Sequence, residues 1–295
     1  MALRIIGAGF GRIFPQDQRH CRLPGRHAGH RDRPAMSRTF PAIALCLALS
    51  LAACIAPQQE AAQPETSPPG LDAVAFASAM GDAAAQSGAN IDRALFAIAD
   101  DNPALVWRDP ATRESLLMVS LMSQEAYDTY WQGKESGRTY AGAPVSWVTA
   151  APQVREFCSA TGLQGEALAM RIRQYLGLRP ERAYDVFVEL WIARDDLFRP
   201  CPDPEIDDRA CEIAFPLEGG MPVAPAVKGV PDYLAWFEGN YAYAYGPTGA
   251  PWTRLGYTYD WNPATPKFGA SEYLITTDAP YEIERVVPLD AYCTP

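Results

Sequence analysis

The chain has 295 residues, a formal net charge of −10 and three His, all of which lie before residue 54. Residues 1–53 also hold eight of the 25 basic residues and two of the 35 acids, which leaves 17 basic and 33 acidic residues in 54–295. This acidic, His-free remainder excludes a Ser-His-Asp triad and a His-ligated metal centre, and its charge repels nucleic acids.

The first segment with a clear pattern is a short apolar run, Phe40–Leu51, which follows Met36 and Arg38. A transmembrane helix needs about 20 apolar residues, and this run has only about a dozen. A short apolar core after a basic residue is typical of a cleaved export signal. We therefore expect residues 36–53 to be a signal peptide.

The run ends in Leu51-Ala52-Ala53-Cys54, and residues 36–57 resemble the signal peptide and lipobox of a bacterial lipoprotein precursor. The resemblance implies cleavage before Cys54 and acylation of its thiol, which would hold the mature chain at a membrane. It also implies sorting to the outer membrane, facing the periplasm, because Ile55 rather than Asp follows the acylated residue. The chain is too acidic to favour anionic headgroups, so the acyl chains are the expected anchor.

Residues 1–35 precede this signal and are expected to be a non-native upstream extension, because Met36 starts a signal of ordinary length. They contain Gly7, Gly9 and Gly11, which imitate a dinucleotide-binding motif. That motif needs a strand before it and a helix after it, whereas here Pro15 follows closely. We expect no nucleotide site and no cofactor.

The segment after Cys54 is expected to be a tether. Residues 54–70 contain four Pro and few bulky apolar residues, so they cannot bury enough surface to become ordered. Residues 71–295 are long enough for a single globular domain.

Four Cys remain after Cys54, an even number in an exported chain, which predicts two disulfides. We favour a pair Cys201–Cys211, which closes a short acidic loop, and a pair Cys158–Cys293, which ties down the C-terminus. The chain-entropy model gives the shorter loop about 3 kcal/mol. A zinc site is the alternative, but no C-x-x-C spacing supports it.

Residues 71–140 are expected to be helical. Leu71–Gln86 is rich in Ala, and Ile91–Ala99 places apolar residues at helical spacing. Asp109 followed by Pro110 predicts the start of a third helix, which would run to about Trp131. Its buried face would be formed by Leu116, Val119, Leu121, Met122, Tyr127 and Tyr130.

Residues 141–230 are expected to mix helices and strands. Helices are predicted over Pro152–Ala160 and Glu166–Leu176, ended by Gly162 and Gly177. Alternation of apolar residues predicts a strand over Tyr184–Ala193. Further strands are expected at Val145–Thr149 and Cys211–Phe215.

Residues 231–295 are expected to be rich in strands after a short helix at Pro231–Tyr241. Short runs of β-branched and aromatic residues predict strands over Leu255–Trp261, Glu272–Thr276 and Ile283–Val287. Helices first and strands later indicate an α+β fold, with a helical N-terminal part packed on a mixed or antiparallel β-rich C-terminal part.

Aromatic residues are concentrated between residues 233 and 261. Tyr and Trp join a flat apolar face to a polar edge, which suits the binding of sugars, peptides or flat rings. The alternative is that these residues fill the core. The candidate ligand-binding residues are Trp236, Trp252, Tyr257, Tyr259 and Trp261.

Three charged residues, Arg254, Asp260 and Glu272, lie in aromatic, strand-like parts of the sequence. As a catalytic group, Glu272 would act as acid or base at a glycosidic bond, with Asp260 as its partner and Arg254 holding an anionic group. The alternative is that they form structural ion pairs or lie on the surface.

The loop between Cys201 and Cys211 is acidic. Its carboxylates offer oxygen ligands to a hard cation such as Ca²⁺, but their spacing does not fit an EF-hand. The alternative is a solvated loop held by a disulfide. The candidate ligands are Asp203, Glu205, Asp207 and Asp208.

The best single interpretation is an acyl-anchored envelope lipoprotein. Its domain would bind an envelope glycan, a small ligand or a protein partner without catalysis, and Cys54 would join it to the membrane. One alternative is a carboxylate-based hydrolase or transferase that acts on a glycosidic or N-glycosidic bond. A second alternative is an inhibitor or immunity-type protein.

Overall fold

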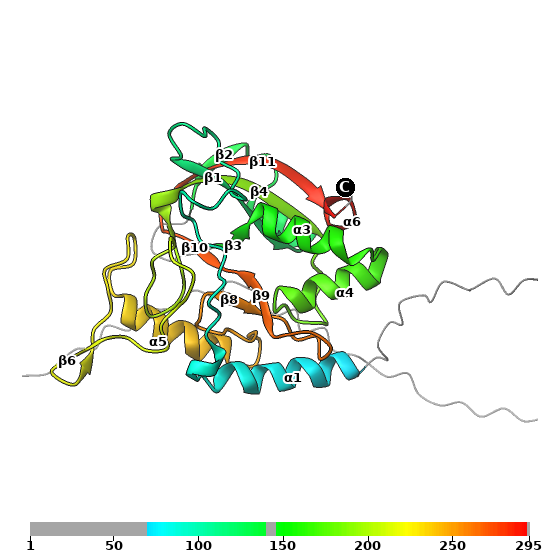
Figure 1. Ribbon diagram of the computed structural model, residues 1–295. Helices are drawn as coiled ribbons and strands as arrows, with labels where there is room; N and C mark the ends of the chain where they lie inside the picture. Colours follow the sequence, from blue (N-terminus) through cyan, green and yellow to red (C-terminus); the bar gives the residue numbers. More distant parts are fainter. Residues whose placement is uncertain (1–69, 140–145, 294–295) are drawn as a thin grey trace, which may run out of the picture. The chain divides into compact units, whose positions relative to one another are not determined.

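The computed structural model describes residues 70–139 and 146–293, so the leader, Cys54 and nearly all of the tether lie outside the described residues. Its largest element is a seven-stranded sheet in the order β2-β11-β4-β1-β3-β10-β5 (Figure 1). Every strand pairing within the described ranges is antiparallel, and the α+β class is confirmed. The strands of this sheet are β1 (Ser115–Met122), β2 (Ser136–Arg138), β3 (Ser146–Ala150), β4 (Val186–Ala193), β5 (Leu197–Phe198), β10 (Tyr273–Ile275) and β11 (Pro280–Pro288).

The central pair of the sheet is β1 with β4, which are in register from Ser115↔Ala193 to Met122↔Val186. Both strands are almost continuously apolar, and successive side chains alternate between two buried faces. A sheet that is apolar on both faces must be covered on both sides.

One face is covered by helices α3 (Ala151–Thr161), α4 (Gly165–Tyr175) and α6 (Leu289–Tyr292) (Figure 1). The other face is covered by the segment 91–107, which has no regular helix, and by Tyr127 of α2 (Gln124–Tyr130). No helix in the described ranges is long and apolar enough to cross a membrane.

The helix predicted at Ile91–Ala99 is wrong. The segment is irregular, and its backbone bonds to a distant loop, with Leu95 N–H donating to Arg209 O and Ile98 N–H to Ile206 O. Leu95, Ala97 and Ile98 are buried, but the hydrogen bonds that order the segment are long-range rather than helical.

The prediction of a helix from Asp109 to Trp131 is also wrong over most of that segment. Asp109 starts a turn, in which its Oδ1 accepts a hydrogen bond from Ala111 N–H at 2.8 Å. The apolar residues that follow form β1, because a continuous apolar run suits a strand buried on both faces. The helix α2 begins later, where Ser123 Oγ caps Ala126 N–H at 3.1 Å.

The remaining predicted elements lie close to the observed ones, except that Cys211–Phe215 forms no strand. Gly162 ends α3 with a φ of 65°, as a C-terminal glycine should. The confirmed elements outside the sheet are α1 (Leu71–Ala84), α3, α4, α5 (Tyr233–Ala244) and β8 (Tyr257–Tyr259). Elements that were not predicted include β2, β5 and α6, as well as β9 (Phe268–Ser271), which pairs with β8, and the hairpin β6 (Leu217–Glu218) and β7 (Met221–Pro222).

Both predicted disulfides are present. Cys158–Cys293 ties α3 to the end of α6 across 135 residues, and Cys201–Cys211 closes the ten-residue acidic loop. All four sulfurs belong to buried cysteines of the core. The disulfides therefore act inside the packed domain rather than on its surface.

A buried ion-pair cluster lies on the helical face of β4. The carboxylate of Glu189 is almost fully buried and pairs with Arg155 of α3 and Arg285 of β11. Both guanidinium groups also lie near the ring of Tyr292, at 5.3 and 5.8 Å from its centroid. Glu189 is thus a structural charge that joins three elements.

Candidate functional site

A hollow of the described structure lies where β1 and β3 separate. The two strands pair only at Met118↔Ala150 and Val119↔Thr149. Beyond this point β3 continues to pair with β10, whereas β1 continues to pair with β4. A cavity of about 450 Å³ is lined by both strand ends, by the loop 176–184 and by α5 with the loop that follows it.

The cavity lining is mostly apolar and aromatic with a few polar groups, which is the usual composition of a small-ligand site. Two of its aromatic side chains reach solvent, because Trp147 is 39% exposed and Tyr243 58% exposed. Trp252 is buried deeper and meets Trp147 edge-on, with ring centroids 6.1 Å apart. The cavity therefore has flat apolar rings at its opening and buried polar groups within.

Glu272 lies between the two-stranded sheet β8–β9 and strand β10 of the large sheet. Its neighbour Ser271 ends β9 and pairs with Tyr257, while Tyr273 begins β10 and pairs with Val148. The Glu272 backbone N–H donates to Gly256 O at 3.0 Å, which fixes the chain at this junction. This position brings the Glu272 side chain into the cavity lining.

The Glu272 carboxyl is fully buried, and this burial determines its pKa. Burial raises the pKa of Glu272 well above its ordinary value of 4.5, and the nearby Trp252 indole N–H lowers it only in part. The neutral form is favoured because the apolar surroundings do not solvate a carboxylate.

Three buried polar atoms in the cavity lining make no well-formed hydrogen bond within the described protein, although the Trp252 indole N–H lies near enough to the Glu272 carboxyl to lower its pKa: Glu272 Oε1, Trp252 Nε1 and Asn240 Nδ2. Buried polar groups are normally bonded, and each unpaired one costs about 1–3 kcal/mol. The other unpaired buried atoms of the described residues are all Arg Nε atoms, on guanidinium groups that bond through their other nitrogens. The cost is therefore concentrated in this cavity.

Asp260 is not the partner of Glu272 that the sequence suggested. Its two oxygens accept hydrogen bonds from Arg171 at 3.0 and 2.6 Å, and both side chains are largely buried. Asp260 does not line the cavity, and Glu272 is the only carboxyl group among the described residues that do. The two-carboxylate arrangement of a glycosidase is therefore not present there.

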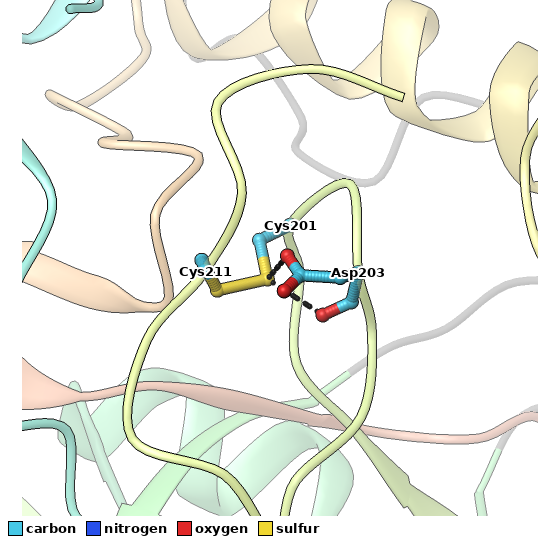
Figure 2. A group of neighbouring side chains, drawn as sticks. All are labelled: Cys201, Asp203 and Cys211. Carbon is cyan, nitrogen blue, oxygen red and sulfur yellow. Dashed lines mark hydrogen bonds between the residues drawn. A yellow bond between two sulfur atoms is a disulfide. The ribbon is translucent and has the colours of Figure 1, made fainter. Parts of the chain in front are cut away.

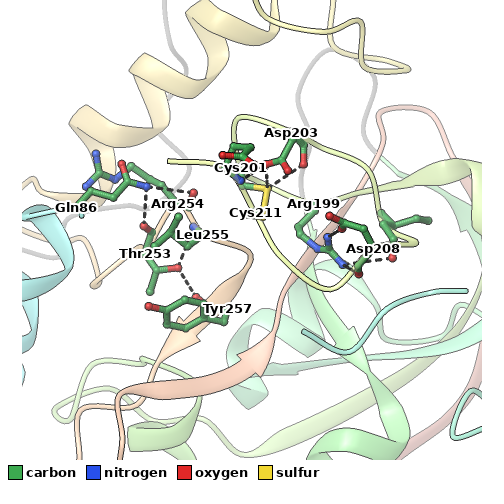
Figure 3. Close-up of a disulfide and its surroundings, with 12 residues drawn as sticks. Gln86, Arg199, Cys201, Asp203, Asp208, Cys211, Thr253, Arg254, Leu255 and Tyr257 are labelled. Carbon is green, nitrogen blue, oxygen red and sulfur yellow. Dashed lines mark hydrogen bonds and ion pairs between the residues drawn. A yellow bond between two sulfur atoms is a disulfide. The ribbon is translucent and has the colours of Figure 1, made fainter. Parts of the chain in front are cut away.

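Arg254 does not hold an anion at this site either. Its Nη2 donates to the carbonyls of Ala83 and Ala84, at 3.1 and 2.8 Å, where α1 ends. Its backbone has a φ of 60°, and its carbonyl accepts a hydrogen bond from Gln86 at 3.4 Å (Figure 3). Arg254 thus caps the last turn of α1, whose carbonyls lack helical partners.

Of the five candidate aromatic residues, only Trp252 lines the cavity. Trp236 stacks on Tyr233 with centroids 5.4 Å apart, and Trp261 donates its indole N–H to Leu178 O at 2.9 Å. The hydroxyls of Tyr257 and Tyr259 donate to Asn90 O and Asp82, respectively. These four candidates therefore make contacts within the protein and do not line the cavity.

Four further cavity residues are not among the candidates named from the sequence: Trp147, Asn240, Tyr243 and Thr248. Tyr243 lies within the aromatic concentration between residues 233 and 261, and Asn240 is a polar residue inside it, whereas Trp147 and Thr248 carry no local signal. These two residues come from separate elements that only the fold brings together.

The acidic loop does not bring its four candidate calcium ligands together. Asp208 pairs with the fully buried Arg199 (Figure 3), and Asp207 lies 3.9 Å from Arg194, so these carboxylates face different partners. Glu205 joins no close group of metal-binding side chains in the described ranges.

The only such group there is Cys201, Asp203 and Cys211 (Figure 2). Its two sulfurs are bonded to each other and are not free to bind a metal ion. Burial raises the pKa of Asp203 to about 6, and its Oδ1 accepts a hydrogen bond from Glu212 N–H at 2.6 Å. Asp203 therefore orders the loop.

The cavity around Glu272, Trp252 and Asn240 is thus the candidate site, and its geometry indicates binding of a small molecule. Comparison of the chain with protein families, with curated proteins and with solved structures finds no match in any of the three.

Proposed function

We propose that this protein is an acyl-anchored lipoprotein of the bacterial cell envelope whose domain binds a small uncharged ligand in the cavity around Glu272. The observation that carries the proposal is the group of three unpartnered polar atoms in that cavity. A fold tolerates such a local cost where the groups serve function. A ligand that bonds to them recovers the cost on binding.

The cavity favours an uncharged ligand. Its single carboxyl group, Glu272, has a raised pKa and so is a poor counter-ion for a cation. The Nη1 of Arg179 donates to the carbonyls of Pro247 and Gly249, at 3.2 and 3.0 Å, and its Nε bonds to Glu181. A charged ligand would also lose its hydration against a mostly apolar wall.

Binding without catalysis is the preferred reading, because the described lining offers one carboxyl group and residues 54–295 contain no His. A hydrolase with Glu272 as general acid is the second candidate, and the raised pKa of that carboxyl favours it. Such an enzyme needs a second group to act as nucleophile or base. Turnover of a chromogenic glycoside that is lost in Glu272→Gln would favour this candidate over binding alone.

Cys54 supplies the proposed membrane attachment. The lipobox is the main support, and the two disulfides agree with it because structural disulfides persist in oxidising compartments such as the periplasm.

We expect Cys54→Ser to release the chain from the membrane fraction of a bacterial host, since acyl chains would be its main hold on the bilayer. Fractionation with an alkyne-labelled fatty acid measures this: the wild-type chain takes up label and sediments with membranes, and the variant does neither. Cys46→Ser, in the expected leader, is the matched control and should behave as wild type. Label retained by Cys54→Ser would rule out acylation at this residue.

We expect Thr248→Trp to abolish ligand binding, because this exposed residue lines the cavity and a large ring there fills the opening. Saturation-transfer NMR on the full chain would screen glucose, N-acetylglucosamine, N-acetylalanine amide and benzamide. At least one compound should receive signal from the wild type and none from Thr248→Trp.

Thr112→Trp is the control for this variant, because Thr112 is also exposed but lies outside the cavity. It should bind as the wild type does. Binding that is equal in Thr248→Trp and the wild type would place the ligand elsewhere. Absence of binding across the whole panel would count against the proposed function.

A further inference from the structure

The unpaired groups of the cavity define what a ligand must offer. The Trp252 indole N–H and the Asn240 amide N–H₂ are donors, so each requires an acceptor atom on the ligand. Glu272 Oε1 is a carboxyl oxygen, and it can accept a hydrogen bond only if the ligand supplies a donor. A matching ligand group therefore combines acceptor capacity for two donors with one donor of its own.

A secondary amide has this combination. Its carbonyl oxygen has two lone pairs, enough for both Trp252 and Asn240, and its N–H can donate to Glu272. Asn240 lies on α5 and Glu272 at the β9–β10 junction, so the partners come from separate elements. An amide, which spreads its acceptor and donor over two atoms, suits this better than a single hydroxyl oxygen.

The rest of the lining indicates what carries the amide. Trp147 and Tyr243 present partly exposed aromatic faces, and such faces pack against the flat apolar side of a sugar ring. Ser120, Ser146 and Thr149 also line the cavity and offer hydroxyl groups. A volume of about 450 Å³ lies in the range of small-molecule sites.

Charge separates an acetylated amino sugar from a free one. Two arginines, Arg179 and Arg182, line the cavity, and Glu272 is its only acid among the described residues. Arg179 is paired with Glu181, so the main cost to an ammonium group is the loss of its hydration in an apolar setting, whereas an acetamido group carries no charge and buries its methyl group favourably.

We propose that the ligand is an N-acetylated amino sugar whose acetamido group bonds to Trp252, Asn240 and Glu272. This inference rests on the proposed function and adds the chemical class of the ligand. The sugar is either a free saccharide or part of the cell-wall glycan, since both sources carry the same group.

Isothermal titration of the full chain with four probes tests the inference. N-acetylglucosamine should bind at least about tenfold more tightly than glucose or glucosamine, because two or three added hydrogen bonds are worth more than one factor of ten. It should also bind more tightly than N-acetylalanine amide, which has the amide but no sugar ring. Pull-down with insoluble cell-wall glycan then separates the sources, since retention assigns the wall and monosaccharide binding alone assigns a free sugar.

Trp252→Phe keeps an aromatic ring, smaller than the indole, and removes the indole N–H. It should weaken N-acetylglucosamine binding about tenfold, the usual value of one hydrogen bond to a buried group, with glucose binding unchanged. Trp191→Phe is the matched control, because its indole donates to Glu284 outside the cavity. If Trp252→Phe fails to fold, as judged by circular dichroism, Asn240→Leu makes the same test from α5.

The affinities of the four compounds test the acetamido group and the sugar ring separately. Equal affinity for glucose and N-acetylglucosamine overturns the acetamido inference but leaves a sugar-binding cavity. Tighter binding of N-acetylalanine amide overturns the sugar and assigns a peptide instead. Binding of none of the four compounds overturns this inference. The proposed function itself fails only if benzamide also gives no signal in the saturation-transfer screen.

Discussion

Loss of the Cys158–Cys293 disulfide is expected to lower the free energy of unfolding by about 5 kcal/mol. The bond links residues 135 apart, so its removal frees a long loop of the unfolded chain. It also releases α6 from α3, and these helices cover the same face of the large sheet. Urea unfolding of the Cys158→Ala/Cys293→Ala double variant measures the loss.

The second disulfide supplies the matched comparison. Cys201 and Cys211 are also buried but are only ten residues apart, so Cys201→Ala/Cys211→Ala should cost about 3 kcal/mol in the same chain-entropy model. The two double variants remove the same atoms, and the difference between them reports the loop length. If the Cys201/Cys211 variant were the less stable of the two, chain entropy would not explain the C-terminal disulfide.

Glu272→Gln is expected to stabilise the protein at neutral pH. The folded-state pKa of Glu272 is raised, so the folded protein holds this proton to a higher pH than the unfolded chain does. Stability from this group is complete below the ordinary pKa of about 4.5 and is lost as the pH rises toward the raised value. Within that window the loss is about 1.4 kcal/mol per pH unit, and Gln, which does not ionise, avoids it.

Unfolding free energies of wild type and Glu272→Gln, measured between pH 4 and pH 8, test this directly. The two should agree near pH 4 and diverge as the pH rises, with the variant more stable. Glu282→Gln is the control, because Glu282 and its partner Arg108 are half-exposed and solvent screens the pair. A wild-type curve parallel to that of Glu272→Gln would show that Glu272 ionises freely in the folded state.

The sequence predicts strands well where the pattern has a single reading. Tyr184–Ala193 alternates in period two and is β4 in the structure, within two residues at its start. The run Ser115–Met122 is apolar at nearly every position, and such a run fits a buried helix or a buried strand equally well. Asp109 and Pro110 resemble a helix start and therefore favour the helix. Only the pairing with β4 shows that the run is a strand.

The candidate site was predicted only in part, for a related reason. Glu272 and Trp252 stood out as residues whose chemistry contrasts with their surroundings, and both line the cavity. Asp260 stood out equally, but its partner Arg171 is 89 residues away, and no local pattern links them. Arg254 likewise bonds to the end of α1, 170 residues earlier in the chain. Long-range partners decide whether a conspicuous charge is structural or functional.

The cavity also explains why a small-ligand function is compatible with a stable fold. The structural charges of the described core are paired, as Glu189 is with Arg155 and Arg285. Apart from four Arg Nε atoms, the unpaired buried side-chain atoms of the described residues all lie in the cavity lining, which has an opening to solvent. We expect stability and binding to change in opposite directions when those groups are altered.

The hydrogen-bond state of the Trp252 indole N–H reports directly whether the cavity is the ligand site. The chain has seven Trp, and their indole N–H signals are resolved by ¹⁵N NMR and assigned by Trp252→Phe and Trp191→Phe. A ligand in the cavity should shift the Trp252 signal, while the signals of Trp191 and Trp261, whose N–H groups already have partners, stay in place. If N-acetylglucosamine and the other panel compounds all leave the Trp252 signal unmoved at millimolar concentration, the cavity is not the ligand site.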